Sequence, residues 1–141
     1  MEITSETQAI EVLSDPSEAQ TYREKAIRYL SDLGNEKAID QLVRALQDDD
    51  FGVRWEAAVS LSQLGEKTLP VLLEALTDPE RVADPRLREG TYHILHYTRG
   101  QHYLVSTTRL MKALKSPAAD IATMVEAGRL QRKLAAIGMQ N

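Results

Sequence analysis

The sequence predicts an all-α fold, an α-solenoid of stacked antiparallel helix pairs. Two observations predict it: the chain repeats itself, and its apolar residues recur at helical spacing. The stretch Arg23–Gly34 returns 31 residues later as Arg54–Gly65, with six of twelve positions identical. Repeats of about this length are single helix pairs that bury their apolar faces against neighbouring pairs. We therefore expect one domain over 1–141, with about three full repeats flanked by half repeats.

The expected elements follow from apolar spacing along the chain. In order they are a half repeat, three full repeats and a terminal helix, over about 4–14, 18–47, 51–77, 84–115 and 118–138. In the second repeat, intervals of three and four residues mark one apolar stripe on each helix. These stripes are Val53, Ala57, Ala58, Leu61 and Leu64, and then Leu69, Leu72, Leu73 and Leu76.

Turn residues agree with these helix ends. Asp84 followed by Pro85 is typical of an N-cap ahead of a proline in the first helical position. Gly34, Gly65 and Gly100 stand where first helices end, and we expect them in the left-handed conformation. Residues 81–83 are interpreted as a longer loop before the third repeat.

Composition excludes several classes of protein. The 141 residues include no cysteine, which excludes disulfides, thiolate metal sites and cysteine nucleophiles. No apolar run approaches the length of a membrane span, and the first residues are too acidic and polar for a secretory signal. We expect a cytoplasmic protein that does not enter a membrane.

Charge is divided unevenly along the chain, which carries a net charge of -4. Residues 1–80 contain 7 Lys and Arg against 17 Asp and Glu, whereas residues 81–141 contain 10 against 4. Because stacked repeats lay sequence out in space, we expect an acidic end and a basic end.

Two segments resemble a known repeat family. Asp50-Phe-Gly-Val-Arg54 and Asp84-Pro-Arg-Leu-Arg88, each leading into an apolar helix, resemble the short HEAT-type repeats of phycobilisome lyase subunits. The resemblance covers roughly residues 7–115. It implies a repeat class found in bilin lyase subunits, antenna degradation factors, a di-iron hydroxylase and scaffolds. The hydroxylase uses adjacent His-Glu pairs, which this chain lacks, so its chemistry does not carry over.

The recurring Asp and Arg residues invite a catalytic or a structural interpretation, and we favour the structural one. Each Asp caps its helix, and the Arg one turn later can reach its own carboxylate or one in the adjacent unit. A charge pair that recurs at each repeat is typical of contacts between units. The residues expected in capping and inter-repeat roles are Asp50, Arg54, Asp84 and Arg88.

Three histidines are interleaved with tyrosines in the third repeat. His93 and His96 share a helix face, and Glu89 completes a two-histidine, one-carboxylate set on paper. Without a full ligand count we expect a polar helix face, with no metal and no cofactor. Whether Tyr92, His93, His96 and His102 form a ligand site stays open at this point.

Binding surfaces are predicted from repeat register. Aligned second helices place Arg44, Glu74 and Lys112 in one row of a concave face, and Gln41, Val71 and Arg109 in the next. Trp55 aligns with charged residues in the other repeats, so it either lies at the surface beside Phe51 or folds over the preceding unit. Large exposed aromatic residues are frequent interaction hot spots.

The predicted function is a non-enzymatic scaffold or adaptor that offers a protein partner a concave helical surface and a charge gradient. One alternative, from the resemblance, is a phycobiliprotein-associated factor, either a bilin lyase-type subunit or an antenna turnover factor. A second is binding of a nucleic-acid backbone by the basic half, which the acidic half disfavours. The terminal helix also offers apolar surface for self-association, through Ile121, Met124, Val125, Leu130, Leu134 and Ile137.

Overall fold

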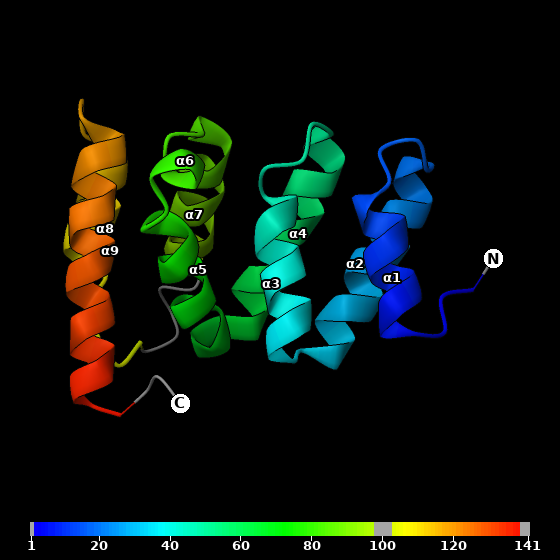
Figure 1. Ribbon diagram of the computed structural model, residues 1–141, viewed down its shortest axis with the longest axis horizontal. Coiled ribbons are helices and arrows are strands. Elements are labelled where there is room, and N and C mark those ends of the chain that lie inside the picture. The colour runs from blue at the N-terminus through cyan, green and yellow to red at the C-terminus, as the bar shows by residue number, and fades with distance from the viewer. Residues whose placement is uncertain (1, 98–102, 139–141) are drawn as a thin grey trace.

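A computed structural model describes residues 2–97 and 103–138, and all regular structure in these ranges is helical (Figure 1). The elements are α1 (Glu6–Ser14), α2 (Gln20–Leu33), α3 (Glu36–Ala45), α4 (Phe51–Leu64), the 3-10 turn η1 (Gly65–Thr68), α5 (Leu69–Leu76), α6 (Pro79–Val82), α7 (Pro85–Tyr97), α8 (Thr108–Leu114) and α9 (Ala119–Ala136). The predicted all-α solenoid is confirmed.

The helices form two rows. In one row α2, α4 and α7 pack in succession, and in the other α1, α3 and α5 do the same. The units follow one another along the longest axis, with α1 and α2 at one end and α8 and α9 at the other (Figure 1). The acidic first part of the chain and the basic last part therefore lie toward opposite ends.

The core lies between the two rows and continues from unit to unit. Fully buried apolar side chains come from each row and include Ile27, Leu42, Leu61, Leu72 and Leu87. Burying one such side chain contributes about 1.5–3 kcal/mol. Because every pair depends on its neighbours for this burial, stacking stabilises the fold.

The third unit is not assembled as predicted. We expected the helix ending near residue 115 to follow α3 and α5 in the second row, but α9 packs against α5 and α8 packs against α7 and α9. The reason is length: α8 has 7 residues and α9 has 18. The longer helix buries Thr123, Ala127, Leu130 and Leu134.

The expected loop at 81–83 is also partly helical. Pro79–Val82 form α6, whose first turn is capped by Asp78 through hydrogen bonds from the backbone N–H groups of Glu80 and Arg81. Asp78-Pro79 is the same cap-then-proline pattern that we recognised at residues 84 and 85. The turn buries Val82.

Glycines allow the turns after α2 and α4, in different conformations. Gly34 has φ 57° and ψ 18°, the left-handed conformation that was predicted. Gly65 has φ 65° but ψ -131°, so the left-handed prediction is wrong there. The chain instead enters η1, where the Thr68 hydroxyl donates to the Leu61 carbonyl at 3.0 Å. Gly100 lies outside the described residues.

Replacing Gly65 with alanine is expected to lower the free energy of unfolding by about 1–3 kcal/mol, because a Cβ is strained at this φ and ψ. Gly128→Ala is the matched control. Gly128 lies inside α9, and its nearest neighbour would be 3.6 Å from an added Cβ, so this change is expected to stabilise by about 0.5–1 kcal/mol. Urea unfolding followed by circular dichroism measures the free energy of unfolding of both variants. Equal changes in the two would contradict the backbone conformation assigned to Gly65.

Candidate interaction surface

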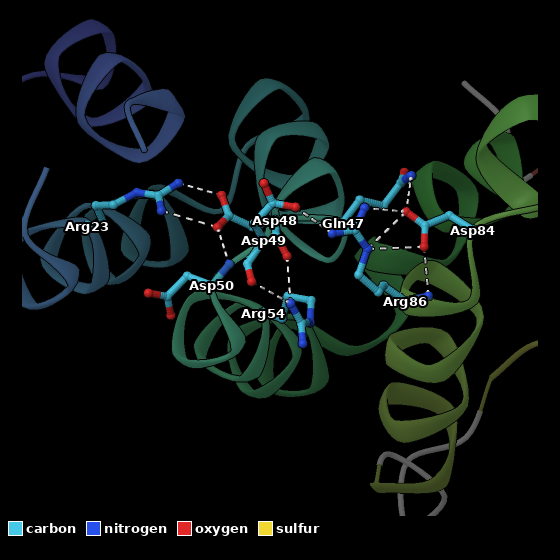
Figure 2. Close-up of polar contacts among 8 residues, drawn as sticks. All are labelled: Arg23, Gln47, Asp48, Asp49, Asp50, Arg54, Asp84 and Arg86. Atoms are coloured by element: carbon cyan, nitrogen blue, oxygen red, sulfur yellow. Dashed lines mark hydrogen bonds and ion pairs between the residues drawn. The ribbon is translucent and has the colours of Figure 1, made fainter. Parts of the chain in front are cut away.

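A polar network surrounds the loop between α3 and α4 (Figure 2). On one side, the guanidinium of Arg23 from α2 is almost fully buried. It donates to the Leu13 carbonyl at 2.6 Å through Nη2 and at 3.2 Å through Nε, and it forms an ion pair with Asp48. Asp48 Oδ1 also accepts from the backbone N–H of Asp50 at 2.9 Å. Arg23 thereby ties α1 and α2 to this loop.

On the other side, α7 contacts the same loop. Arg86 forms ion pairs with Asp84 at 3.0 Å and with Asp49 at 2.8 Å (Figure 2). Gln47 donates to Asp84 at 3.1 Å. Partial burial alone would raise the pKa of Asp84, but the hydrogen bonds from Arg86 and Gln47 lower it to about 2. The loop therefore joins consecutive units through charge-assisted hydrogen bonds.

The aspartates predicted as caps accept backbone hydrogen bonds. Asp50 accepts from the N–H of Val53 at 3.2 Å, and Asp84 accepts from the N–H of Arg86 at 2.9 Å. Each therefore satisfies an N–H group of the first turn, which has no partner inside the helix.

The arginines differ from the expectation. Arg54 donates to the Asp48 carbonyl at 2.8 Å, and Arg88 donates to the Val82 carbonyl at 2.7 Å; among residues 2–97 and 103–138, neither forms an ion pair with a carboxylate. Both acceptors lie six residues earlier, where chain reversals leave carbonyls without helical partners. Other arginines make carboxylate contacts between units, among them Arg23, Arg28 and Arg86, which the Asp and Arg pattern did not single out.

An aromatic row crosses from α4 to α7. Ring centroids are 6.5 Å apart for Phe51 and Trp55, 4.7 Å for Trp55 and His93, and 4.3 Å for His93 and Tyr97. Phe51, Trp55 and Tyr97 are 68%, 48% and 67% exposed. We call these four residues the aromatic surface. Trp55 thus lies at the surface beside Phe51, and its ring contact is with the following unit, not the preceding one.

The aromatic surface borders a cavity of about 180 Å³ between α4 and α7. Leu46 and Ala58 supply apolar lining, and Arg54, Arg86 and Glu89 are the charged residues around it. Residue 90 on α7 is glycine, and an added Cβ there would lie 3.0 Å from the side chain of Leu46 at the end of α3. Since α4 and α7 pack directly against each other, the aromatic rings that they carry are held in place.

The two described histidines are held in ring contacts. His93 lies between Trp55 and Tyr97, while His96 contacts Tyr92 at 6.0 Å and Tyr97 at 5.3 Å. Burial, and then the neighbouring charge of His96, lower the pKa of His93. Within residues 2–97 and 103–138, no group of three or more His, Asp and Glu could hold a metal ion. His102 lies outside the described residues.

The predicted rows of second-helix residues extend over two helices, not three. Arg44 and Gln41 lie on α3, and Glu74 and Val71 lie on α5. Lys112 and Arg109 lie on α8, which packs against α7, so the prediction that they continue these rows is wrong. Arg109 instead pairs with Glu126 of α9 at 3.1 Å.

The terminal helix keeps part of its apolar surface exposed. Leu130 and Leu134 are buried in the core, whereas Ile121, Val125 and Ile137 are exposed. Self-association through this helix stays a prediction. In the part of the chain that the structure covers, no helix has the length and apolarity needed to cross a membrane.

Comparison with known proteins identifies the repeat family of this chain. A family model for HEAT repeats matches residues 7–93. A phycocyanobilin lyase subunit alpha from Nostoc sp. (strain PCC 7120 / SAG 25.82 / UTEX 2576) is 42% identical over 71 residues, which are 48% of this chain and 26% of the relative. The chain therefore spans about a quarter of that relative's length. No solved structure matches the chain. Since the family model covers more than half of the sequence, the chain belongs to the HEAT repeat family.

Proposed function

We propose that this chain is a non-enzymatic interaction module that binds a protein partner through the aromatic surface of α4 and α7. The observation that carries the proposal is the row of exposed rings at Phe51, Trp55 and Tyr97, joined through His93. Aromatic side chains are enriched at protein interfaces and supply much of the binding energy there. Exposed rings in a continuous row are costly to hydrate, which favours a partner that covers them.

The two packed helices that carry the aromatic surface favour binding with little rearrangement. The rings lie on two packed helices, so little conformational freedom is lost when a partner binds. The guanidinium of Arg54 lies 5.5 Å from the Phe51 ring centroid, which restrains that exposed ring further. The charge gradient and the two-helix rows that include Arg44 and Glu74 provide further polar contacts in this proposal.

Trp55→Ala is expected to weaken partner binding by about 2–4 kcal/mol, the loss typical of a central aromatic hot spot. A tagged chain and this variant serve as paired baits in a lysate of the source organism. A protein that the unmodified chain retains and the variant loses is then purified, and both dissociation constants are measured by calorimetry. Leu104→Ser is the control, because Leu104 is 61% exposed but lies outside the aromatic surface.

Trp55 also provides a direct readout, because it is the single tryptophan in the chain. With 5-fluorotryptophan incorporated, the purified partner should shift one ¹⁹F resonance and reduce its exposure to solvent. A partner that binds with full affinity to Trp55→Ala, or that leaves this resonance unchanged, would refute the proposed surface.

The similarity to a phycocyanobilin lyase subunit supports a second candidate, a role in handling bilins. Its test is to add phycocyanobilin to the purified chain and record the visible absorption spectrum. A saturable spectral change that Trp55→Ala abolishes would favour this function over protein binding alone. An unchanged spectrum would remove it.

A further inference from the structure

We infer that a basic groove between α7 and α8 binds an acidic segment of a partner protein. Two adjoining cavities of about 290 and 430 Å³ share Tyr92, Lys115 and Ser116. Arg88 lines the first cavity and Lys112 lines the second. These five residues define the basic groove, and the inference does not depend on what the aromatic surface binds.

The basic groove carries an excess of positive charge. Among the described residues that line it, the cations are Arg88, Lys112 and Lys115, and the one carboxylate is that of Glu89. Lys112 and Lys115 are exposed, and no carboxylate of the described residues lies within ion-pair distance of either. These two ammonium groups are therefore available to a ligand.

Lys115 is also held in place. Its Nζ lies 4.2 Å from the centroid of the Tyr92 ring, a cation–π contact that restrains the side chain without neutralising its charge. Tyr92 in turn stacks on His96 at 6.0 Å. A restrained cation loses less conformational freedom when it meets a carboxylate than a free lysine does.

A basic residue of α8 outside the groove differs from the two lysines because it has a carboxylate partner. Arg109 is on the same helix as Lys112, but it pairs with Glu126, which also accepts from Arg129 at 2.8 Å. The fold thus supplies an internal carboxylate where α8 faces α9 and none to the two lysines of the groove. This charge imbalance favours an occupant that brings its own carboxylates.

An acidic peptide segment fits the basic groove better than a nucleic acid. Nucleic acids carry a charge at every nucleotide and are bound through many phosphates. The groove offers three cations beside one carboxylate, and residues 1–80 carry 17 acidic against 7 basic residues. A long polyanion would be repelled along that part of the stack, whereas a short acidic segment would not.

The test uses a fluorescein-labelled ten-residue peptide of alternating glutamate and serine, with fluorescence anisotropy as the readout at low ionic strength. We expect saturable binding to the unmodified chain and about tenfold or greater weakening by the double change Lys112→Glu and Lys115→Glu, because attraction becomes repulsion. Arg132→Glu with Lys133→Glu is the matched control, since it makes the same charge change on exposed residues of α9. We expect it to stay within about twofold of the unmodified chain.

Several outcomes would overturn the inference. Equal weakening by the control pair would show a response to net charge alone, and equal binding of a glutamine-for-glutamate peptide would show no preference for carboxylates. Tighter binding of a ten-nucleotide oligothymidylate that displaces the peptide would assign the groove to nucleic acid. Circular dichroism verifies that the variants are folded. The ¹⁹F resonance of Trp55 reports on the aromatic surface separately, so failure of one proposal is distinguishable from failure of the other.

Discussion

Replacing Asp48 with alanine is expected to lower the free energy of unfolding by about 3–5 kcal/mol, the usual cost of leaving a buried charge without its partner. The Arg23 side chain is only 4% exposed and the Asp48 side chain 18% exposed, so water cannot readily replace the lost carboxylate. The variant also removes the acceptor of the Asp50 backbone N–H. Urea unfolding monitored by far-ultraviolet circular dichroism measures the difference.

The adjacent residue supplies a matched control. Asp49 forms an ion pair with Arg86, but its side chain is 98% exposed, so Asp49→Ala is expected to cost less than about 1 kcal/mol. A second change, Arg23→Met, should restore much of the stability of Asp48→Ala, because it removes the unpaired buried charge. Comparable losses at residues 48 and 49 would show that the buried ion pair does not stabilise the loop between α3 and α4.

Leu72→Ala is expected to lower the free energy of unfolding by about 2–5 kcal/mol, through lost apolar burial and the cavity left behind. Leu72 is fully buried in α5, and α5 packs against both α3 and α9. A cavity here weakens the row at the point where the last helix joins the stack. Thermal and urea unfolding measure the effect, and the same samples give the slope of unfolding with urea, which reports on cooperativity.

Leu33→Ala is the control for this core substitution. Leu33 ends α2 and is 42% exposed, so its truncation leaves no closed cavity and is expected to cost less than about 1 kcal/mol. If Leu72→Ala proved as mild as Leu33→Ala, the α5 row would not be part of the cooperative core. A lower urea slope with Leu72→Ala would instead indicate that the units near α9 unfold separately.

Much of the fold was predictable because helix pairs are encoded locally. Apolar spacing predicted the helices now assigned as α4 and α5, and the aspartate before α4 accepts the backbone hydrogen bond typical of a cap. The short helix α6 was missed although Asp78-Pro79 carries the same signal as the pair at 84 and 85, because four residues are too few to show periodicity.

The candidate surface was predictable only in part. Trp55 stood out as a large aromatic residue at a position that is charged in the other repeats, with Phe51 beside it. The contact between Trp55 and His93 was not predicted, because repeat alignment pairs Trp55 with Glu89, one helical turn away. That offset depends on how α7 packs along α4, which is a property of the whole helix contact. Alignment of the repeats alone does not specify this offset between α4 and α7.

The repeat class, the helix pairs and the separation of acidic from basic residues are all encoded in local sequence, since periodicity, caps and charge are properties of neighbouring residues. Three features depend on how the helices pack: α9 follows α5 in the second row, Arg23 pairs with Asp48, and rings from α4 and α7 form one surface. These contacts join residues far apart in the chain. Their geometry depends on helix length and on side-chain volume at each crossing, so it emerges only when the whole stack packs.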